Sequence, residues 1–416
     1  MTGTVHIIGA GLGGLSAAVR LASLGRRKVA VHEATAFAGG RCRSYHDAAI
    51  GMTIDNGNHL LLSGNTAALA YLRDVGAEQR LIGPQHAEFF FVDLKSGARW
   101  TLKFNDGRLP FWIFDRNSRV PGTQPLDYLS LARLLWVRER QTVGEVIPCE
   151  GVLYERLVEP LILAALNIDP PQGSARLAAA IVRETLAVGG RACRPLIARE
   201  GLGPTLVEPA LAFLKQRGAT LYLEHQLRAL AFADGRVETL DFGAETIALG
   251  ADDTVILAVP PYAAAMLVRG LDVPNEFRAI VNAHFRIAPP ADLPPILGVL
   301  NATTQWLFSF PGRLSVTISA GDRLIDTPRE ELAATIWSEV ARVTGLPATL
   351  PPWQIVRERR ATFAATPAQD LKRPHTATNW SNLFLAGDWT DTGLPATIEG
   401  AIRSGNRAAH MIAQLP

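Results

Sequence analysis

A glycine-rich turn near the amino terminus, GAGLGG at residues 9–14, limits the possible folds of this chain more than any other part of its sequence. An apolar run at 5–8 comes before the turn, and residues 15–25 after it place apolar side chains three and four positions apart. This order predicts a strand, a tight turn and a helix that ends at Gly25. A further apolar run, KVAVHE at 28–33, predicts a second strand. The chain therefore opens with a β-α-β unit.

Gly9, Gly11 and Gly14 give the turn the G-x-G-x-x-G spacing of dinucleotide-binding proteins. Small residues there permit close approach of a pyrophosphate, toward which the amide groups at the helix amino terminus point. Glu33 follows Gly14 by 19 residues, at the end of the second predicted strand. Its carboxylate can accept hydrogen bonds from an adenosine ribose and would repel a 2′-phosphate. The predicted dinucleotide site comprises Gly9, Gly11, Leu12, Gly13, Gly14 and Glu33.

The residues after the second strand distinguish a flavin site from an ordinary glycine turn. AGGRCRS at 38–44 resembles the Gly-Gly-Arg signature of the flavin amine oxidase and phytoene desaturase superfamily. The resemblance implies that Gly39 and Gly40 let the backbone pass close to FAD. It also implies that Arg41 supplies positive charge near the pyrophosphate or the flavin. Taken alone, these residues would be a turn followed by a solvated cation.

A second segment, DNGNH at 55–59, resembles the segment beside the isoalloxazine ring in the same superfamily. The resemblance implies FAD contacts from Asn56, Gly57 and His59. His59 and Asp55 are also the first candidates for a catalytic acid, because the resemblance puts both near the flavin. Each has an alternative role, since a single histidine is more often structural and Asp55 can equally accept hydrogen bonds from loop amides.

The carboxy-terminal segment LFLAGDWTDTGLPATIEGA at 383–401 completes the resemblance. In the superfamily a Gly-Asp pair after a strand contacts the ribityl chain or the pyrophosphate, which implies this role for Gly387 and Asp388. The helix that follows can direct amides to the flavin and stabilise negative charge on its reduced form. Otherwise it is a capped amphipathic terminal helix. The other residues assigned to the cofactor site are Leu227, Pro395, Ala396, Thr397 and Ile398.

These signatures imply an α/β fold, in which an FAD-binding Rossmann-like domain of the glutathione-reductase and amine-oxidase type is interleaved with an α+β substrate domain. A chain of 416 residues exceeds one core of about 250 residues, which supports two domains. Apolar spacing predicts helices at 126–188, and two runs at 88–104 predict a hairpin. The expected FAD-binding domain comprises 1–85, 195–265 and 366–416, and the substrate domain comprises 86–194 and 266–365.

Composition argues against several classes of partner. Lys and Arg total 41 against 39 Asp and Glu, and a net charge of +2 gives no reason to expect nucleic acid. Cys42, Cys149 and Cys193 show no C-x-x-C spacing, so neither a disulfide framework nor a metal site is expected. The sequence has no secretory signal pattern and no run of about 18 apolar residues, which favours a cytoplasmic protein.

Segments at 55–65, 159–167, 199–219 and 387–405 resemble the squalene-associated FAD-dependent desaturase family, the hydroxysqualene dehydroxylases of hopanoid biosynthesis. The resemblance covers nearly the whole chain. It implies reduction of hydroxysqualene to squalene, with loss of water and hydride from reduced FAD. A general acid is implied, but the sequence does not select it. The implied partners are a long apolar isoprenoid and an electron donor that stays unknown, because no second complete glycine fingerprint is present.

A long apolar substrate requires a hydrophobic tunnel. The candidates for its lining, which are equally suited to a core, are residues 89–91, Phe111, Trp112 and Phe114. Some aromatic and basic residues can rest on the inner face of a membrane. They are Trp112, Trp136, Arg138 and Arg140. Peripheral membrane contact is therefore an open expectation.

Three other functions share these sequence features. A carotenoid or phytoene desaturase would use oxidised FAD in the same fold to remove hydride from a polyene. A flavin amine oxidase would need an aromatic pair framing the flavin and a positioned lysine, neither of which the sequence identifies. A lipid-binding protein of the Rab-escort kind would hold FAD and lipid without turnover.

Overall fold

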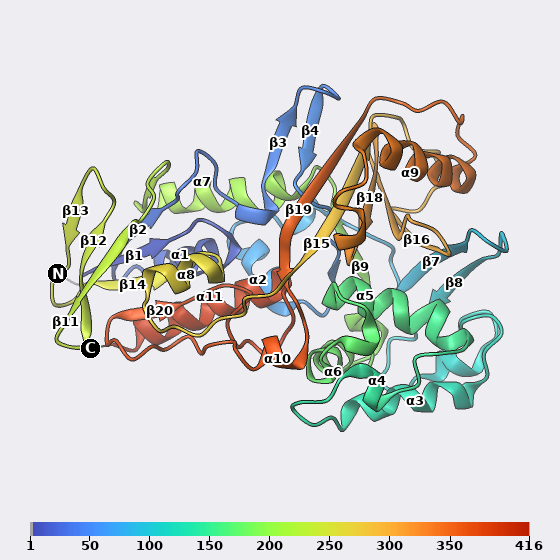
Figure 1. Cartoon of the computed structure of the whole chain (residues 1–416), viewed down its shortest axis with the longest axis horizontal. Coiled ribbons are helices and arrows are strands. Elements are labelled where there is room, and N and C mark those ends of the chain that lie inside the picture. The colour runs from blue at the N-terminus through green and yellow to red at the C-terminus, as the bar shows by residue number, and fades with distance from the viewer. Residues whose placement is uncertain (1–2, 416) are drawn as a thin grey trace.

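A five-stranded parallel sheet gathers strands from distant parts of the chain, in the computed structural model that describes residues 3–415 (Figure 1). Its strands are, in order, β10 (Thr220–Tyr222), β2 (Lys28–His32), β1 (Thr4–Ile8), β14 (Thr254–Leu257) and β20 (Leu383–Leu385). The last four strands are almost entirely buried, as apolar parallel strands covered on both faces must be. The predicted β-α-β opening is confirmed.

Helix α1 (Leu12–Leu24) packs along α11 (Ile398–Ala413), so the first and last helices of the chain lie together. A Cβ atom on Gly405 of α11 would come 2.1 Å from the carbonyl oxygen of Gly13, which explains why this contact needs glycine. Two more helices contact α1, namely α2 (Thr66–Asp74) and α7 (Glu208–Gln216). An antiparallel sheet of β11 (Ala229–Ala233), β12 (Arg236–Asp241) and β13 (Thr246–Ala248) and the helix α8 (Pro261–Leu267) complete this part.

A seven-stranded sheet joins residues 88–103 to residues 277–363. Its strands are, in order, β19 (Trp353–Phe363), β15 (Phe277–Phe285), β18 (Arg313–Ile318), β17 (Trp306–Phe310), β16 (Ile296–Leu300), β7 (Glu88–Asp93) and β8 (Arg99–Lys103). The predicted hairpin is the antiparallel pair of β7 and β8. Helix α9 (Arg329–Thr344) shares a hydrophobic core with this sheet. The predicted domain boundaries stay a prediction.

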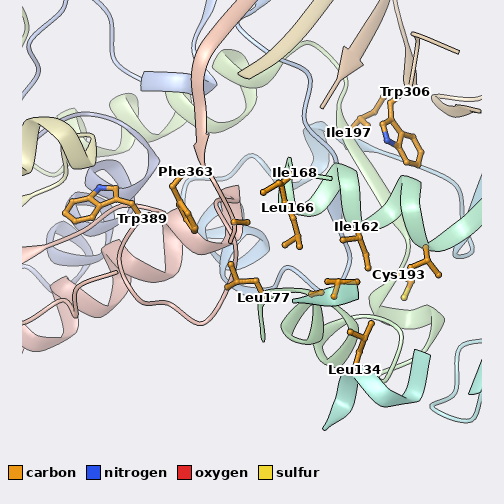
Figure 2. Close-up of a cluster of buried hydrophobic side chains, with 14 of the residues drawn as sticks. Leu134, Ile162, Leu166, Ile168, Leu177, Cys193, Ile197, Trp306, Phe363 and Trp389 are labelled. Carbon is orange, nitrogen blue, oxygen red and sulfur yellow. The ribbon is translucent and has the colours of Figure 1, made fainter. Parts of the chain in front are cut away.

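Residues 125–184 are largely helical, as the apolar spacing predicted, but in separate pieces. They are a 3₁₀ helix (Pro125–Tyr128), α3 (Leu129–Ala132), a second 3₁₀ helix (Arg133–Leu135), α4 (Val143–Val146), a π-helical turn (Tyr154–Val158) that continues into α5 (Glu159–Leu166), a third 3₁₀ helix (Pro170–Gln172) and α6 (Ala175–Glu184). Prolines at 148, 170 and 171 interrupt the helical hydrogen bonding, because proline has no amide donor. Figure 2 shows that the core of this region continues from Leu134 and Leu166 to Phe363 and Trp389.

Short elements connect the large ones. They are a hairpin of β3 (Ser44–Asp47) and β4 (Met52–Asp55), the strands β5 (Leu61–Leu62), β9 (Pro195–Ala198) and β6 (Leu81–Ile82), and the helix α10 (Pro367–Asp370). Within residues 3–415, no helix has both the length and the apolar character needed to cross a membrane.

Candidate functional site

The glycine turn presents the amino terminus of α1 to an anionic ligand. Gly9 has a φ of +105°, and a Cβ on Gly14 would lie 1.9 Å from the Gly9 carbonyl oxygen, so both positions require glycine. Gly11 precedes α1 without a side-chain cap, and the first turn has no acidic residue. A Cβ on Gly11 would meet no protein atom within 4 Å. Because the first amides of a helix have no partner within it, this open end fits a phosphate.

Glu33 lies beside this turn at the end of β2. Its Oε2 accepts the N–H of Ala10 at 2.9 Å, and its Oε1 accepts the N–H and O–H of Thr35 at 3.0 and 2.9 Å. The N–H of His225 donates to the Glu33 carbonyl oxygen at 2.8 Å. This bond ties the loop that contains the buried Leu227 to the predicted ribose position. The structure therefore brings these two predicted residues into one region.

The Gly-Gly-Arg segment packs directly on the glycine turn. The N–H of Gly39 donates to the Ala10 carbonyl oxygen at 2.8 Å, and a Cβ on Gly40 would lie 3.3 Å from the Cα of Gly11. Both glycines have positive φ, +107° and +54°, a conformation that other residues rarely adopt. The two motifs thus form one surface, although most of α1 and all of β2 separate them in sequence.

The carboxy-terminal motif meets the amino-terminal ones. A Cβ on Gly13 would lie 3.2 Å from the amide nitrogen of Gly387. Arg41 donates from Nη2 to Oδ1 of Asp388 at 2.7 Å, and from Nη1 to the carbonyl oxygen of Ala361. The ion pair links residues that are 347 positions apart. The predicted convergence of both chain ends is present in the structure.

A buried arginine supports the loop that carries Asp388. Arg373 donates from Nη2 to the carbonyl oxygens of Asp388 and Thr390 at 3.2 and 2.5 Å. Its Nη1 pairs with Asp370 at 3.1 Å, and its guanidinium lies 5.0 Å from the ring centre of Phe363. Arg373 was not among the predicted residues, because nothing near it in sequence marks a site.

The predicted cofactor residues at the start of α11 differ in exposure, since two of them are buried and two are part-exposed. Thr397 caps the helix by accepting the N–H of Gly400 at 3.0 Å, while Pro395 and Ile398 are buried and Ala396 is half-buried. The next residue, Glu399, is buried and accepts the N–H groups of Ala67 and Ala68 at the start of α2. Their contact with the flavin stays a prediction.

Asp55 has the contacts of a structural acceptor. Its side chain is 2% exposed and accepts the O–H of Ser44 at 2.5 Å and the N–H of Leu202 at 2.8 Å. Arg313, itself 5% exposed, pairs with the other carboxylate oxygen at 3.4 Å. With both oxygens engaged, Asp55 fits the loop-holding alternative better than the acid role, and we do not carry it forward as the acid.

His59 is part-exposed beside the Arg41 and Asp388 pair. Burial of the ring, together with the positive charge of Arg41, lowers the pKa of His59 to about 4, although Asp55 and Asp388 act in the opposite direction. The imidazole is therefore neutral near neutral pH. A neutral ring can donate one hydrogen bond but carries no extra proton.

The DNGNH segment is held by polar residues of the seven-stranded sheet that sequence reasoning missed. Asn56 donates to Glu358 at 3.2 Å. Asn58 donates from its side chain to Thr317 at 3.1 Å and from its backbone to Asn282 at 3.4 Å. Asn282 and Thr317 are buried polar residues within strands, but other polar residues in the same strands, such as His284 and Ser315, are buried as well, so no local signal singles them out.

The predicted tunnel lining is wrong for two aromatic residues. Phe111 and Phe114 are 64% and 66% exposed, so they point away from the interior. Phe89 and Phe91 lie in the core, as the alternative held. Trp112 is half-buried because its ring packs edge-on against two neighbouring aromatic rings. The three-residue period of the 3₁₀ helix puts Phe111 and Phe114 on the same outer side and Ile113 on the inner side, so position in the helix, not hydrophobicity, decides which side chain turns inward.

Comparisons with known proteins agree with this geometry. A family model described as flavin containing amine oxidoreductase matches residues 12–413. The chain is 62% identical over 413 residues to hydroxysqualene dehydroxylase of Rhodopseudomonas palustris, with 99% of each chain covered. It is 59% identical over 411 residues to hydroxysqualene dehydroxylase of Sinorhizobium fredii, covering 99% of this chain and 98% of that one.

More distant relatives show how widely the fold is shared. A probable zeta-carotene desaturase of Synechococcus elongatus is 24% identical, with 97% of each chain covered. The solved structure of cyclohexylamine oxidase from Brevibacterium oxydans superposes with a TM-score of 0.71 at 18% identity, covering 100% of this chain and 99% of that one. The predicted fold class is confirmed.

Proposed function

Because this chain belongs to the flavin-containing amine oxidoreductases, and within them to the hydroxysqualene dehydroxylases, we propose that it reduces hydroxysqualene to squalene with FAD as its cofactor. The observation that carries this function is 62% identity to the Rhodopseudomonas palustris enzyme across 99% of both chains. The reaction breaks one allylic C–O bond and forms one C–H bond. Hydroxysqualene and reduced FAD give squalene, water and oxidised FAD.

The protein has three tasks in this reaction. FAD, when bound and reduced, supplies the hydride. Departure of the hydroxyl as water requires a proton on the leaving oxygen and leaves an allylic cation on the substrate. The chain must therefore hold the reacting carbon near the flavin, keep bulk water away from the cation, and deliver a proton.

We assign the parts of FAD to the residues whose chemistry suits them. The open amino terminus of α1 would hold the pyrophosphate, since Gly11 leaves free space there and no side chain caps the helix. Glu33 would accept hydrogen bonds from the adenosine ribose. Asp388, held in place by its ion pair with Arg41, would contact the ribityl chain or the pyrophosphate.

His59 is proposed as a neutral hydrogen-bonding group near the reacting end of the flavin. Its pKa of about 4 leaves the imidazole uncharged under physiological conditions. An N–H group of this kind can orient a leaving oxygen without donating the proton itself. The proton source is then another group or a water held at the site.

An anaerobic assay with chemically reduced enzyme tests the proposed direction of reaction. Hydroxysqualene should restore the absorbance of oxidised flavin and give one squalene for each flavin. A desaturase would instead turn over only phytoene-like substrates, with an electron acceptor present. Release of hydrogen peroxide with a simple amine would favour an amine oxidase, and binding of isoprenoids without flavin reoxidation would favour a lipid-binding protein.

We further propose that the enzyme works in the cytoplasm in peripheral contact with the membrane that dissolves its substrate. The long apolar isoprenoid partitions into lipid, so an enzyme at the bilayer surface meets it at high local concentration. The free thiols of Cys42, Cys149 and Cys193 are consistent with a reducing compartment. The electron donor is proposed to be a separate reductant.

A further inference from the structure

Six large apolar side chains are exposed within one short stretch of the chain, residues 109–136. Each is at least 64% exposed, and together they are Leu109, Phe111, Phe114, Leu126, Leu129 and Trp136. We call these six residues the outer apolar face. Elsewhere in the described residues, large apolar side chains that are at least 64% exposed occur only singly. Six of them within one short stretch therefore call for an explanation.

Two packed rings bring the parts of this face together in space. The ring of Trp112 lies edge-on to that of Tyr128, with 5.1 Å between their centres. The hydroxyl oxygen of Tyr128 also accepts the N–H of Val120 at 3.0 Å. These contacts hold the 3₁₀ helix Phe111–Phe114 beside the 3₁₀ helix Pro125–Tyr128, with their exposed residues turned outward. In Figure 1, α3 lies at the lower right, far from both chain termini.

Arginines lie among these apolar residues. Between positions 105 and 140 the chain has six arginines against four acidic residues. Five of the arginines are exposed, namely Arg108, Arg116, Arg133, Arg138 and Arg140. The carboxylates of Asp115 and Asp127 accept hydrogen bonds from groups nearby in sequence. Asp115 accepts the O–H of Ser118, and Asp127 accepts the N–H of Gln124. Arginine side chains at the rim of an apolar face can reach lipid phosphates while their stems lie on the acyl chains.

A pocket of about 310 Å³ lies against this face. Asp127 and Ser130 line it, and they stand next in sequence to Leu126 and Leu129. Apolar residues at 147, 148, 153 and 158 form much of the remaining wall. The pocket therefore lies beside the part of the outer apolar face that Leu126 and Leu129 form.

We propose that the outer apolar face docks on an anionic lipid bilayer. Trp136, Phe111 and Leu126 enter the interface, and the surrounding arginines contact the phosphates of acidic lipids. The inference rests on the proposed function only in its choice of a bilayer over a protein partner, because the substrate dissolves in lipid. Of the four residues in the sequence expectation, Trp136, Arg138 and Arg140 belong to this surface, whereas Trp112 packs against neighbouring rings.

Vesicle flotation of the FAD-loaded enzyme without substrate tests this docking. Vesicles of phosphatidylglycerol and phosphatidylethanolamine should carry the enzyme upward, and vesicles of phosphatidylcholine should carry much less. The triple variant Phe111→Ser, Leu126→Ser, Trp136→Ser should bind the anionic vesicles at least about 10-fold more weakly, because three interfacial anchors are lost. A matched control is Met266→Ser with Leu371→Ser, at residues 78% and 45% exposed on other elements, and it should float like the unchanged enzyme.

Equal flotation of the triple variant and the unchanged enzyme, or no flotation of either, would overturn the proposal. So would a dimer in light scattering that the triple variant turns into a monomer, because the face would then bind a second copy. Flavin content and turnover in detergent should be the same for all three proteins. Lack of dehydroxylation by the unchanged enzyme in detergent would refute the proposed function and leave the flotation result standing.

Discussion

Arg41 and Asp388 form an ion pair of 2.7 Å between the loop that follows the first β-α-β unit and the loop before the last helix. The Asp388 side chain is 8% exposed and the Arg41 side chain 42% exposed. The carboxylate is thus fixed at the junction of the three glycine motifs, while the arginine still reaches solvent. This arrangement prepares one charged group for a ligand that bridges both ends of the chain.

Asp388→Asn should weaken FAD binding by about 10- to 100-fold, since a hydrogen bond to a charged group contributes about 1.5–3 kcal/mol. Titration of the apo enzyme, followed by flavin fluorescence, measures the change. Asp326→Asn is the control, because Asp326 is 96% exposed and its ion pair is with Arg359 at 3.8 Å, not with a residue of the glycine motifs. Unchanged affinity of Asp388→Asn would remove this residue from the assigned site.

Gly11→Ala and Gly14→Ala should separate cofactor binding from folding. Gly11 has an ordinary φ of −72°, and its Cβ would meet no protein atom within 4 Å, so apo stability should change by less than about 0.5 kcal/mol. FAD affinity should nevertheless fall at least about 10-fold, because the methyl group would fill the space assigned to the pyrophosphate.

The second variant provides the contrast. A Cβ on Gly14 would lie 1.9 Å from the Gly9 carbonyl oxygen, so Gly14→Ala should destabilise the apo enzyme by about 2 kcal/mol or more. Thermal denaturation without FAD measures both variants. Normal FAD binding by Gly11→Ala would mean that the pyrophosphate lies elsewhere.

Local patterns in the sequence predicted the β-α-β unit and the β7 and β8 hairpin, and the superfamily resemblance implied the meeting of the chain ends. Each of these features depends either on residues that are close in sequence or on a motif in which several glycine positions leave no room for a side chain. Asn282 and Thr317 could not be predicted in the same way, because they reach the DNGNH segment only through the pairing of distant strands. Phe111 was misplaced because apolar character alone does not reveal whether a side chain faces the core or the surface.

Acidification should destabilise the fold through two buried histidines, His32 and His284, which are 1% and 0% exposed. Burial lowers the pKa of each to about 3; His6 and His225 add to the effect at His32, and Arg313 adds to it at His284. The unfolded chain binds a proton near pH 6.5, so the unfolded state holds more protons at any pH between that value and about 3. Stability is therefore full above about pH 6.5 and is lost as the pH falls.

The loss should approach about 1.4 kcal/mol per pH unit for each histidine. Chemical denaturation between about pH 7.5 and about pH 5 measures the slope. His284→Gln should reduce that slope by one histidine's share, whatever it does to absolute stability. A slope that the substitution leaves unchanged would mean that His284 is not the titrating group.

Asp55→Asn distinguishes a structural carboxylate from a catalytic acid. The substitution leaves the buried Arg313 without its charge partner, and breaking such a pair costs about 3–5 kcal/mol. Denaturation should therefore show a large loss of stability. The rate of flavin reoxidation by hydroxysqualene, counted per bound flavin in the folded fraction, should stay within about 3-fold of the unchanged enzyme, because Asp55 makes its contacts with Ser44, Leu202 and Arg313. Loss of a general acid would instead slow that rate by about 100-fold or more while the flavin stays bound. Such a slow step in a folded, flavin-loaded variant would return Asp55 to the reaction as its proton donor.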